Sequence, residues 1–376
     1  MFDRRLWPYI DWVLITLVSL ISVVGFASVY SASLSYGVET IYFKRQVLWF
    51  FVGLVVLAGT TVVDYRNLGK LSLVLHGLVI VLLVLTLLYG TGGPGSRVER
   101  WLKIGPIFLQ PSEFVKFSLV LYLAHFFRDS RRVGDLGIKD VLWPVFLTLL
   151  PFVLILKQPD LGTAGVLLFV FAPVIFLVGL RPKIIGLVAG LAVILAPFAW
   201  FYVLKPYQRG RIMTLLNPEL DPLGKGYHII QSKIAVGSGG IWGKGYLQGT
   251  QAHLNFLPAR HTDFIFSVFS EEWGFIGAAA LVLLYVFLVL WCLKDIGRTK
   301  DRSGTVLVLG VTAILTSQIL INIGMVIGLL PVVGIPLPFM SYGGSAMISH
   351  MIGIGLIVNV RMHQAEIAAT SPTFGS

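Results

Sequence analysis

Apolar residues occur in long runs along almost the whole chain, separated by short charged, glycine-containing or proline-containing segments. A helix needs about 20 mostly apolar residues to cross the ~30 Å hydrocarbon core of a membrane. We expect ten such segments, at about 11–31, 46–63, 71–90, 112–127, 141–157, 161–180, 184–204, 264–293, 304–330 and 341–360. The pattern predicts an all-α integral membrane protein with about ten transmembrane helices.

The basic residues between these runs indicate how the chain crosses the membrane. An even number of spans places both termini on one side, and the positive-inside rule makes that side the cytoplasm. The short segments on the outer side hold fewer basic residues than the short segments on the side of the termini. They are Lys44, Arg45, Arg97, Arg100, Lys103 and Lys157. We expect residues 1–362 to form one polytopic domain and residues 363–376 a short cytoplasmic tail, disordered after Gln364.

One segment departs from this pattern of short connections. Residues 205–262, between the seventh and eighth runs, are rich in glycine, carry several basic residues and lack sustained hydrophobicity. Long loops cross membranes despite their charge, so the orientation places this loop outside the cytoplasm. Its cations and those of the short outer segments favour an anionic substrate head group. The alternative is that they face water or lipid phosphates.

Composition limits the classes of function. Hydrophobic residues make up 56% of the 376 positions and charged residues 12%, too few charges for a typical soluble domain. The formal net charge of +11 fits cytoplasmic loops and anionic lipid, and we do not expect a nucleic-acid partner. The single cysteine, Cys292, excludes an intramolecular disulfide. We find no His/Cys ligand cluster, although Asp263 could share a divalent cation such as Mg²⁺.

Ionisable residues at membrane depth are candidates for function, because a charge there costs from about 3 to more than about 10 kcal/mol. Glu113 and Lys116 lie near the outer start of the fourth run, and their spacing places them on one helical face. We expect a structural ion pair, with Ser112 as the helix N-cap, and the alternative is a cavity wall. Asp160 caps the sixth span, binds substrate beside Lys157 and Gln158, or does both.

Asp263 is the most informative carboxylate. It follows the long outer segment and opens the eighth run, at a depth where a carboxylate is partly desolvated. On a helix, Ser267, Ser270 and Gly274 would continue its face as a small polar stripe. One interpretation is that Asp263 caps this helix. The other is that Thr262 caps it, which leaves the Asp263 carboxylate free as a general base.

Glycine and proline mark two irregular segments. The run from Gly237 to Gly245 lacks the Lys-Ser/Thr pair of a nucleotide P-loop, so we expect it to fold tightly over the membrane. Pro331, Pro336 and Pro338 predict a break between the last two spans. Broken backbone near membrane depth is tolerated where it is buried or lines a cavity.

Together these segments resemble the SEDS family (shape, elongation, division and sporulation) of bacterial peptidoglycan polymerases. The resemblance covers about residues 10–362. It rests on the segments Arg97 to Trp101, Gln110 to Lys116, Lys157 to Thr163, Gly243 to Phe266 and Pro336 to Ser345. Gly243-Lys244-Gly245, followed by Gly249-Thr250-Gln251 and by His261-Thr262-Asp263-Phe264, looks more like the elongation (RodA) branch than the division (FtsW) branch. One departure is Ala259-Arg260, where relatives usually carry Glu after Leu-Pro.

The resemblance implies polymerisation of lipid II. The GlcNAc 4-hydroxyl of lipid II would attack the anomeric carbon of a lipid-linked glycan, form a β-1,4 bond with inversion and release undecaprenyl pyrophosphate. We expect Asp263 to be the catalytic base. Candidate substrate-binding residues are Arg45, Arg97, Lys103, Lys157, Asp160, Lys244, His261 and Ser341.

The resemblance also implies partners and a location. We expect a cognate class B penicillin-binding protein, other elongation-complex proteins and membrane lipids as partners, and an active site on the outer face of the bacterial cytoplasmic membrane. A lipid II flippase and a non-enzymatic scaffold of the elongation complex are the alternatives. A flippase needs a polar path through the full bilayer, and a scaffold would tolerate replacement of Asp263.

Overall fold

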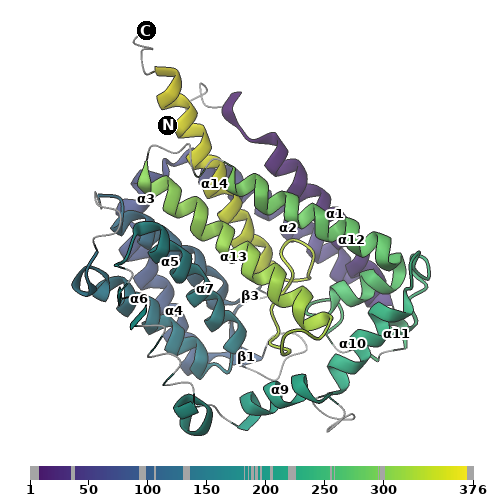
Figure 1. The fold of residues 1–376 in the computed structure, drawn as a ribbon. Helices are drawn as coiled ribbons and strands as arrows, with labels where there is room; N and C mark the ends of the chain where they lie inside the picture. Colours follow the sequence, from purple (N-terminus) through teal and green to yellow (C-terminus); the bar gives the residue numbers. More distant parts are fainter. Residues whose placement is uncertain are drawn as a thin grey trace.

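The chain folds into a bundle of long helices (Figure 1). The computed structural model describes residues 8–370 except 35–38, 93–98, 106, 130–135, 182, 185, 188–189, 191–193, 195–196, 204–205, 219–225, 255, 258, 295 and 297–300. Among the described residues, eight helices are long and apolar enough to cross a membrane. They are α1 (Trp12–Ser33), α2 (Glu39–Val62), α4 (Ser72–Tyr89), α6 (Ile138–Lys157), α7 (Leu161–Val178), α12 (Ile265–Leu293), α13 (Arg302–Val326) and α14 (Gly344–Thr370).

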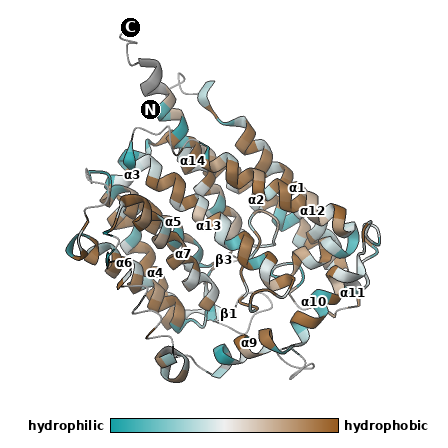
Figure 2. Cartoon of the chain, in the orientation of Figure 1, coloured by the Kyte–Doolittle hydropathy of each residue, from teal (hydrophilic) through white to brown (hydrophobic). Residues whose placement is uncertain are grey.

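These helices correspond to eight of the ten expected spans, and Figure 2 shows hydrophobic residues along them. The chain is therefore a mostly helical, multi-span membrane protein. The fourth expected span is α5 (Pro111–Phe126), which has only 16 residues and is largely buried. The seventh, at 184–204, lies partly outside the described residues; its described positions are helical, and they include η3 (Ala199–Val203). The short α3 (Tyr65–Lys70) connects α2 to α4.

The centre of the bundle is formed by α14. In its most apolar stretch 89% of residues are buried, compared with 22% in α4, which lies at the periphery. α14 packs along α2, and α13 packs on both α5 and α7. Because α5, α13 and α14 are shielded from lipid, their polar side chains must find partners within the protein.

A layer of short elements lies at one end of the bundle, opposite the end at which α1 begins and α14 finishes (Figure 1). It includes an antiparallel sheet of β1 (Thr91–Gly92), β2 (Glu99–Ile104) and β3 (Ile107–Leu109). The expected loop at 205–262 also contributes three helices, α9 (Pro206–Leu216), α10 (Tyr227–Ser238) and α11 (Thr250–His253). This segment is therefore substantially folded, and α10 packs against α12.

The helix α12 is broken at Gly274, where φ is +64°. The glycine-rich segment after α10 supplies the missing backbone partners. Lys244 N–H donates to Glu271 O (3.1 Å), and Phe275 N–H donates to Gly240 O (2.9 Å). A Cβ at Gly243 would overlap the Glu272 carbonyl. The expected tight fold of this segment is therefore a close backbone packing against the break in α12.

Two predictions from the sequence need correction. The polar stripe along α12 does not continue through Gly274, because the helix breaks there, and Ser267 Oγ lies 2.9 Å from Ser232 Oγ of α10. The chain also does not lose regular structure after Gln364, since α14 continues to Thr370. The absence of glycine and proline from this tail segment allows the helix to continue.

We predict that Gly243→Ala destabilises the protein by at least about 2 kcal/mol, because the new methyl group meets backbone at a positive φ of +83°. Gly237→Ala is the matched control, since Gly237 lies in α10 with open space around it. Thermal unfolding in detergent measures both variants. Equal melting temperatures would contradict the close packing at the break.

Candidate active site

Asp263 lies in the turn 259–264 that precedes α12. Its N–H donates to Ala259 O (3.0 Å), and Thr262 Oγ1 donates to the same carbonyl (3.1 Å). The N-cap of α12 is Phe264, and it has no side-chain cap bond. The interpretation that Asp263 or Thr262 caps this helix is therefore wrong. The turn places the cap one residue later, so the Asp263 carboxylate is not committed to the helix end.

The irregular segment between α13 and α14 packs against this turn. α13 ends at Val326 and α14 begins at Gly344, which confirms the break expected from the prolines. Ser341 Oγ donates to Thr262 O (2.6 Å), and Tyr342 N–H donates to His261 O (2.9 Å). Because Ser341 is buried and used in these contacts, its role as a substrate ligand stays a prediction.

The surroundings of Asp263 change the pKa of its carboxyl group. Burial raises the pKa of its carboxyl to about 6, and the neighbouring Thr262 side chain opposes this shift. The positive charges of Arg100 and Arg211 also lower the pKa, whereas the negative charge of Asp160 raises it. A carboxylate with this pKa is more basic than an ordinary aspartate and is still mostly ionised at neutral pH.

His261 does not add a second charge beside Asp263. Burial and the neighbouring Arg260 lower the pKa of His261 to about 4, so its ring is neutral at neutral pH. The ring stacks on Tyr42 of α2 with centroids 4.7 Å apart, and Tyr342 approaches it at 5.8 Å. Arg45 of α2 is exposed and its positive charge acts on Tyr342, so this predicted cation lies at the edge of the same cluster.

Arg100 of β2 connects the sheet of β1, β2 and β3 to the α6–α7 connection. Its Nη1 lies 3.5 Å from Asp160 Oδ2, and its Nε donates to Gln158 O (3.0 Å). Asp160 also caps α7 by accepting from Thr163 N–H (3.1 Å), which confirms the capping prediction. From the sequence, Arg100 is only one of several basic residues in the short segments predicted to lie outside the cytoplasm. Its pairing with Asp160 depends on a fold contact that has no local sequence signal.

The other predicted cations do not converge on Asp263 in the part of the chain that the structure describes. Lys103 is exposed on β2 and Lys157 is exposed at the end of α6. Arg97 lies outside the described residues. Lys244 forms an ion pair with Glu271 of α12, with Nζ to Oε1 at 2.6 Å. The substrate-binding roles of these four residues stay predictions.

The Glu271 carboxylate anchors the chain between α10 and α11. Besides Lys244, it accepts from Thr250 Oγ1 (3.0 Å) and from the Gln251 N–H (3.1 Å). The adjacent Glu272 accepts from Ser31 at the end of α1. Both carboxylates are buried. They therefore fix the segment that leads to Asp263 against α1 and α12.

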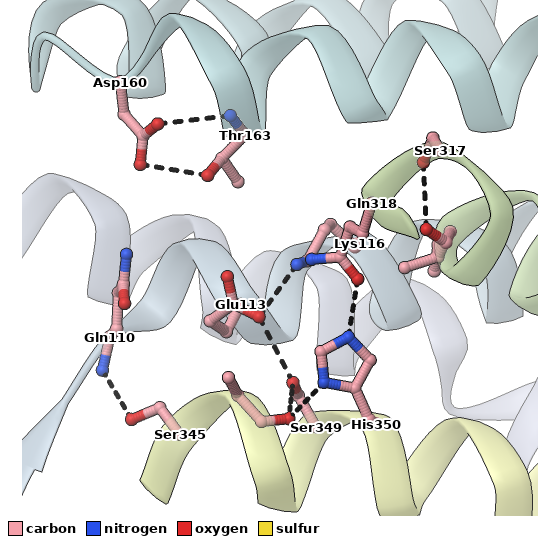
Figure 3. Close-up of polar contacts among 12 residues, drawn as sticks. Gln110, Glu113, Lys116, Asp160, Thr163, Ser317, Gln318, Ser345, Ser349 and His350 are labelled. Carbon is pink, nitrogen blue, oxygen red and sulfur yellow. Dashed lines mark hydrogen bonds and ion pairs between the residues drawn. The ribbon is translucent and has the colours of Figure 1, made fainter. Parts of the chain in front are cut away.

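A second polar cluster lies inside the bundle (Figure 3). Lys116 Nζ donates to Glu113 Oε2 at 2.8 Å, as their spacing predicts, and both side chains are buried. Ser349 of α14 lies 3.5 Å from the same carboxylate, and His350 contacts Gln318 of α13. The cluster joins α5, α13 and α14 through contacts that satisfy charges in the protein interior. Its structural role, as opposed to a cavity wall, stays a proposal.

The predicted N-cap of α5 is wrong. The N-cap is Gln110, which makes no side-chain cap bond, and Pro111 begins the helix. Proline is favoured at this position because its missing N–H would have no intrahelical partner. Ser112 Oγ is instead buried without a hydrogen-bond partner among the described residues.

Metal binding has no cluster to support it in the described part of the chain. There, no group of three or more His, Cys, Asp or Glu side chains is placed to hold an ion. A divalent cation shared by Asp263 and substrate would need ligands from the substrate itself. This role of Asp263 stays a prediction.

Comparison with known proteins identifies the family. Residues 9–366 match the model of the cell cycle protein family that comprises FtsW, RodA and SpoVE. The chain is 41% identical to peptidoglycan glycosyltransferase MrdB of Escherichia coli K12, over 86% of this chain and 87% of that protein. It is 31% identical to peptidoglycan glycosyltransferase RodA of Treponema pallidum, over 94% and 98% of the two chains. The chain therefore belongs to the SEDS family, as the resemblance of its motifs predicts.

Solved structures agree with this assignment. A chain from a peptidoglycan synthase complex, studied for its coordination of polymerization and crosslinking, matches with a TM-score of 0.80 and 35% identity. The match covers 94% of this chain and 98% of that one. The rod shape determining protein RodA of Thermus thermophilus matches with a TM-score of 0.70 and 30% identity, over 94% and 97% of the chains.

We predict that Glu113→Lys or Lys116→Glu alone destabilises the protein by about 3–5 kcal/mol, because each leaves two like charges buried together. The double reversal should regain part of this loss. Recovery should be incomplete because Ser349 then faces an ammonium group. Thermal unfolding in detergent measures all three variants. A double variant no more stable than either single variant would exclude a structural ion pair.

Proposed function

We propose that the chain is a RodA-like peptidoglycan glycosyltransferase for cell elongation in which Asp263 is the general base for extension of a glycan strand with lipid II. The observation that carries this assignment is the Asp263 carboxylate itself. It has a pKa raised to about 6 and does not cap α12, and it lies in a chain whose relatives are peptidoglycan glycosyltransferases.

In the proposed reaction, Asp263 accepts the proton of the GlcNAc 4-hydroxyl of lipid II. The 4-oxygen then forms a bond to the anomeric carbon of the lipid-linked glycan. The bond from that carbon to undecaprenyl pyrophosphate breaks, and its electron pair leaves with the pyrophosphate. Attack from the opposite face inverts the anomeric configuration and gives a β-1,4 link. This single displacement needs a base on the acceptor side, without a covalent enzyme intermediate.

Charge that develops on the leaving pyrophosphate needs cations. Arg45 is the best placed of the described candidates, because it is exposed and its charge acts on Tyr342, whose N–H donates to His261 O. Lys103 is exposed on the outer sheet, whereas Arg100 is paired with Asp160 and Lys244 with Glu271. We assign Arg45 and Lys103 to pyrophosphate binding, where preorganised positive charge stabilises the departing group.

The arrangement of the helices supports a site on the outer face of the bacterial cytoplasmic membrane. α1 begins and α14 finishes at one end of the bundle, and the layer with the outer sheet and α9–α11 lies at the other (Figure 1). The proposed topology has ten spans, with both termini in the cytoplasm. A class B penicillin-binding protein is the proposed partner, supported by the likeness to a chain of a peptidoglycan synthase complex.

We predict that Asp263→Asn and Asp263→Ala lower glycan formation from purified lipid II by at least about 100-fold, since general base catalysis contributes about that much or more. Asp129→Asn is the control, because Asp129 is an exposed carboxylate paired with Arg128. Melting temperatures confirm that each variant folds. Undiminished glycan product from the Asp263 variants would defeat the assignment, and translocation of lipid II without polymerisation by the native chain would favour a flippase.

A further inference from the structure

The backbone of Asp263 is held by a buried asparagine on another helix. Asn322 lies in α13 and is fully buried. Its Nδ2 donates to Asp263 O (2.9 Å) and to Ile335 O (2.7 Å). One amide group therefore ties the turn before α12 to the irregular segment between α13 and α14.

The residue beside Ile335 lies next to the Asp263 side chain. Gly334 has a φ of +72°, a conformation that favours glycine. A Cβ at this position would lie 3.2 Å from Asp263 Oδ2 and 3.9 Å from its Cγ. A larger residue at position 334 would therefore press on the carboxylate as well as strain the backbone.

The Nδ2 atom of Asn322 makes both hydrogen bonds to the backbone, and its Oδ1 atom makes none in the described part of the chain. Its NH₂ group must face the two carbonyls, because only the nitrogen can donate. This fixes the amide orientation and leaves Oδ1 buried without a hydrogen-bond partner among the described residues. Such an atom is unfavourable in a protein interior. The asparagine is therefore used here for its two donors, which hold two backbone carbonyls.

Asn359 of α14 provides an internal comparison. It is also fully buried, and its Nδ2 donates to Thr60 O (2.8 Å) and Val63 O (2.7 Å). Its Oδ1, however, accepts from Tyr65 N–H (3.0 Å), so every polar atom of this amide is satisfied. Asn359 joins α2 and α14 at a place distant in the fold from Asp263. The two residues share a bonding pattern and differ in what they hold.

We propose that Asn322 and Gly334 are positioning residues, which fix the Asp263 carboxylate from its backbone and from its Oδ2 side. This inference rests on the proposed role of Asp263 as base. Asn322 holds the backbone of the base in place, and Gly334 leaves the space that the carboxylate occupies. Neither residue needs to touch substrate.

The electrostatic surroundings of the base come from several elements. The charged groups that act on the Asp263 carboxylate are Arg100 of β2, Asp160 before α7 and Arg211 of α9, and the side chain of Thr262 lowers its pKa. A methyl group at position 334 would exclude water from one side of the partly exposed carboxylate. This disfavours the ionised form and raises its pKa. Because the base must be ionised, the acid limb of the rate profile then moves to higher pH.

The first test compares Asn322→Leu with Asn359→Leu in the full-length chain, assayed for glycan formation from lipid II. Both variants lose two side-chain hydrogen bonds to backbone carbonyls, so both should have a lower melting temperature. We expect Asn322→Leu to lower kcat by about 10-fold to 100-fold with KM nearly unchanged, because a displaced base reacts poorly. Asn359→Leu should retain the kcat of the native chain below its melting temperature.

The second test compares Gly334→Ala with Gly240→Ala. Gly240 also has a positive φ, at +55°, but no atom lies within 4 Å of a Cβ built there. Both substitutions strain the backbone, and only Gly334→Ala reaches the carboxylate. We expect Gly334→Ala alone to lower kcat and to move the acid limb to higher pH. This comparison stands even where Asn322→Leu fails to fold.

The outcomes separate this inference from the proposed function. If the native chain forms glycan and Asp263→Asn abolishes it, the role of Asp263 holds. If Gly334→Ala then shows the pH profile of Gly240→Ala, or if a folded Asn322→Leu retains the kcat of Asn359→Leu, the positioning role is wrong. A shift of the acid limb in Gly334→Ala alone supports it, because a purely structural contact would lower stability without moving that limb.

Discussion

Backbone amides and carbonyls inside a membrane must find partners within the protein, because hydrocarbon offers none. Two irregular segments of this chain meet that requirement, one by pairing with the break in α12 and the other by pairing with the turn before α12. The glycine-rich segment after α10 pairs with the backbone exposed by the break at Gly274. The segment between α13 and α14 pairs with the turn 259–264. Ser341 donates to Thr262 O, and Asn322 hydrogen-bonds a carbonyl in each of the two segments. These contacts fix both ends of the first half of α12, and Asp263 lies at its start.

The need for polar groups to find partners within the protein also separates the carboxylates of this chain into two kinds. Glu113, Glu271 and Asp160 are each buried and each pair with a cation, namely Lys116, Lys244 and Arg100. Their charges are satisfied by the fold. Asp263 instead lies next to Gly334 and is only partly buried, and Arg100 and Arg211 act on it through their charges. A partly buried carboxylate that has no ion pair among the described residues is suited to accept a proton from substrate.

The local pattern of the sequence predicts much of this architecture. Long apolar runs predict the spanning helices, the spacing of Glu113 and Lys116 predicts their ion pair, and the prolines predict the break before α14. Other features depend on contacts between distant segments. Apolar residues continue on both sides of Gly274, so the pattern gives no sign of the break in α12. The pairing of Arg100 with Asp160 and the position of Gly334 against Asp263 follow from the packing of separate elements, which no local motif records. Their prediction requires the three-dimensional fold.

The central claim is that the rate of glycan formation depends on the ionised Asp263 carboxylate. The most direct measurement is the pH dependence of kcat/KM for lipid II polymerisation by the full-length chain. Because the pKa of Asp263 is raised to about 6 and the base must be ionised, the rate should rise with pH through a midpoint near about 6 and level off above it. A rate that stays constant as the pH falls from about 7 to about 5 would contradict this account.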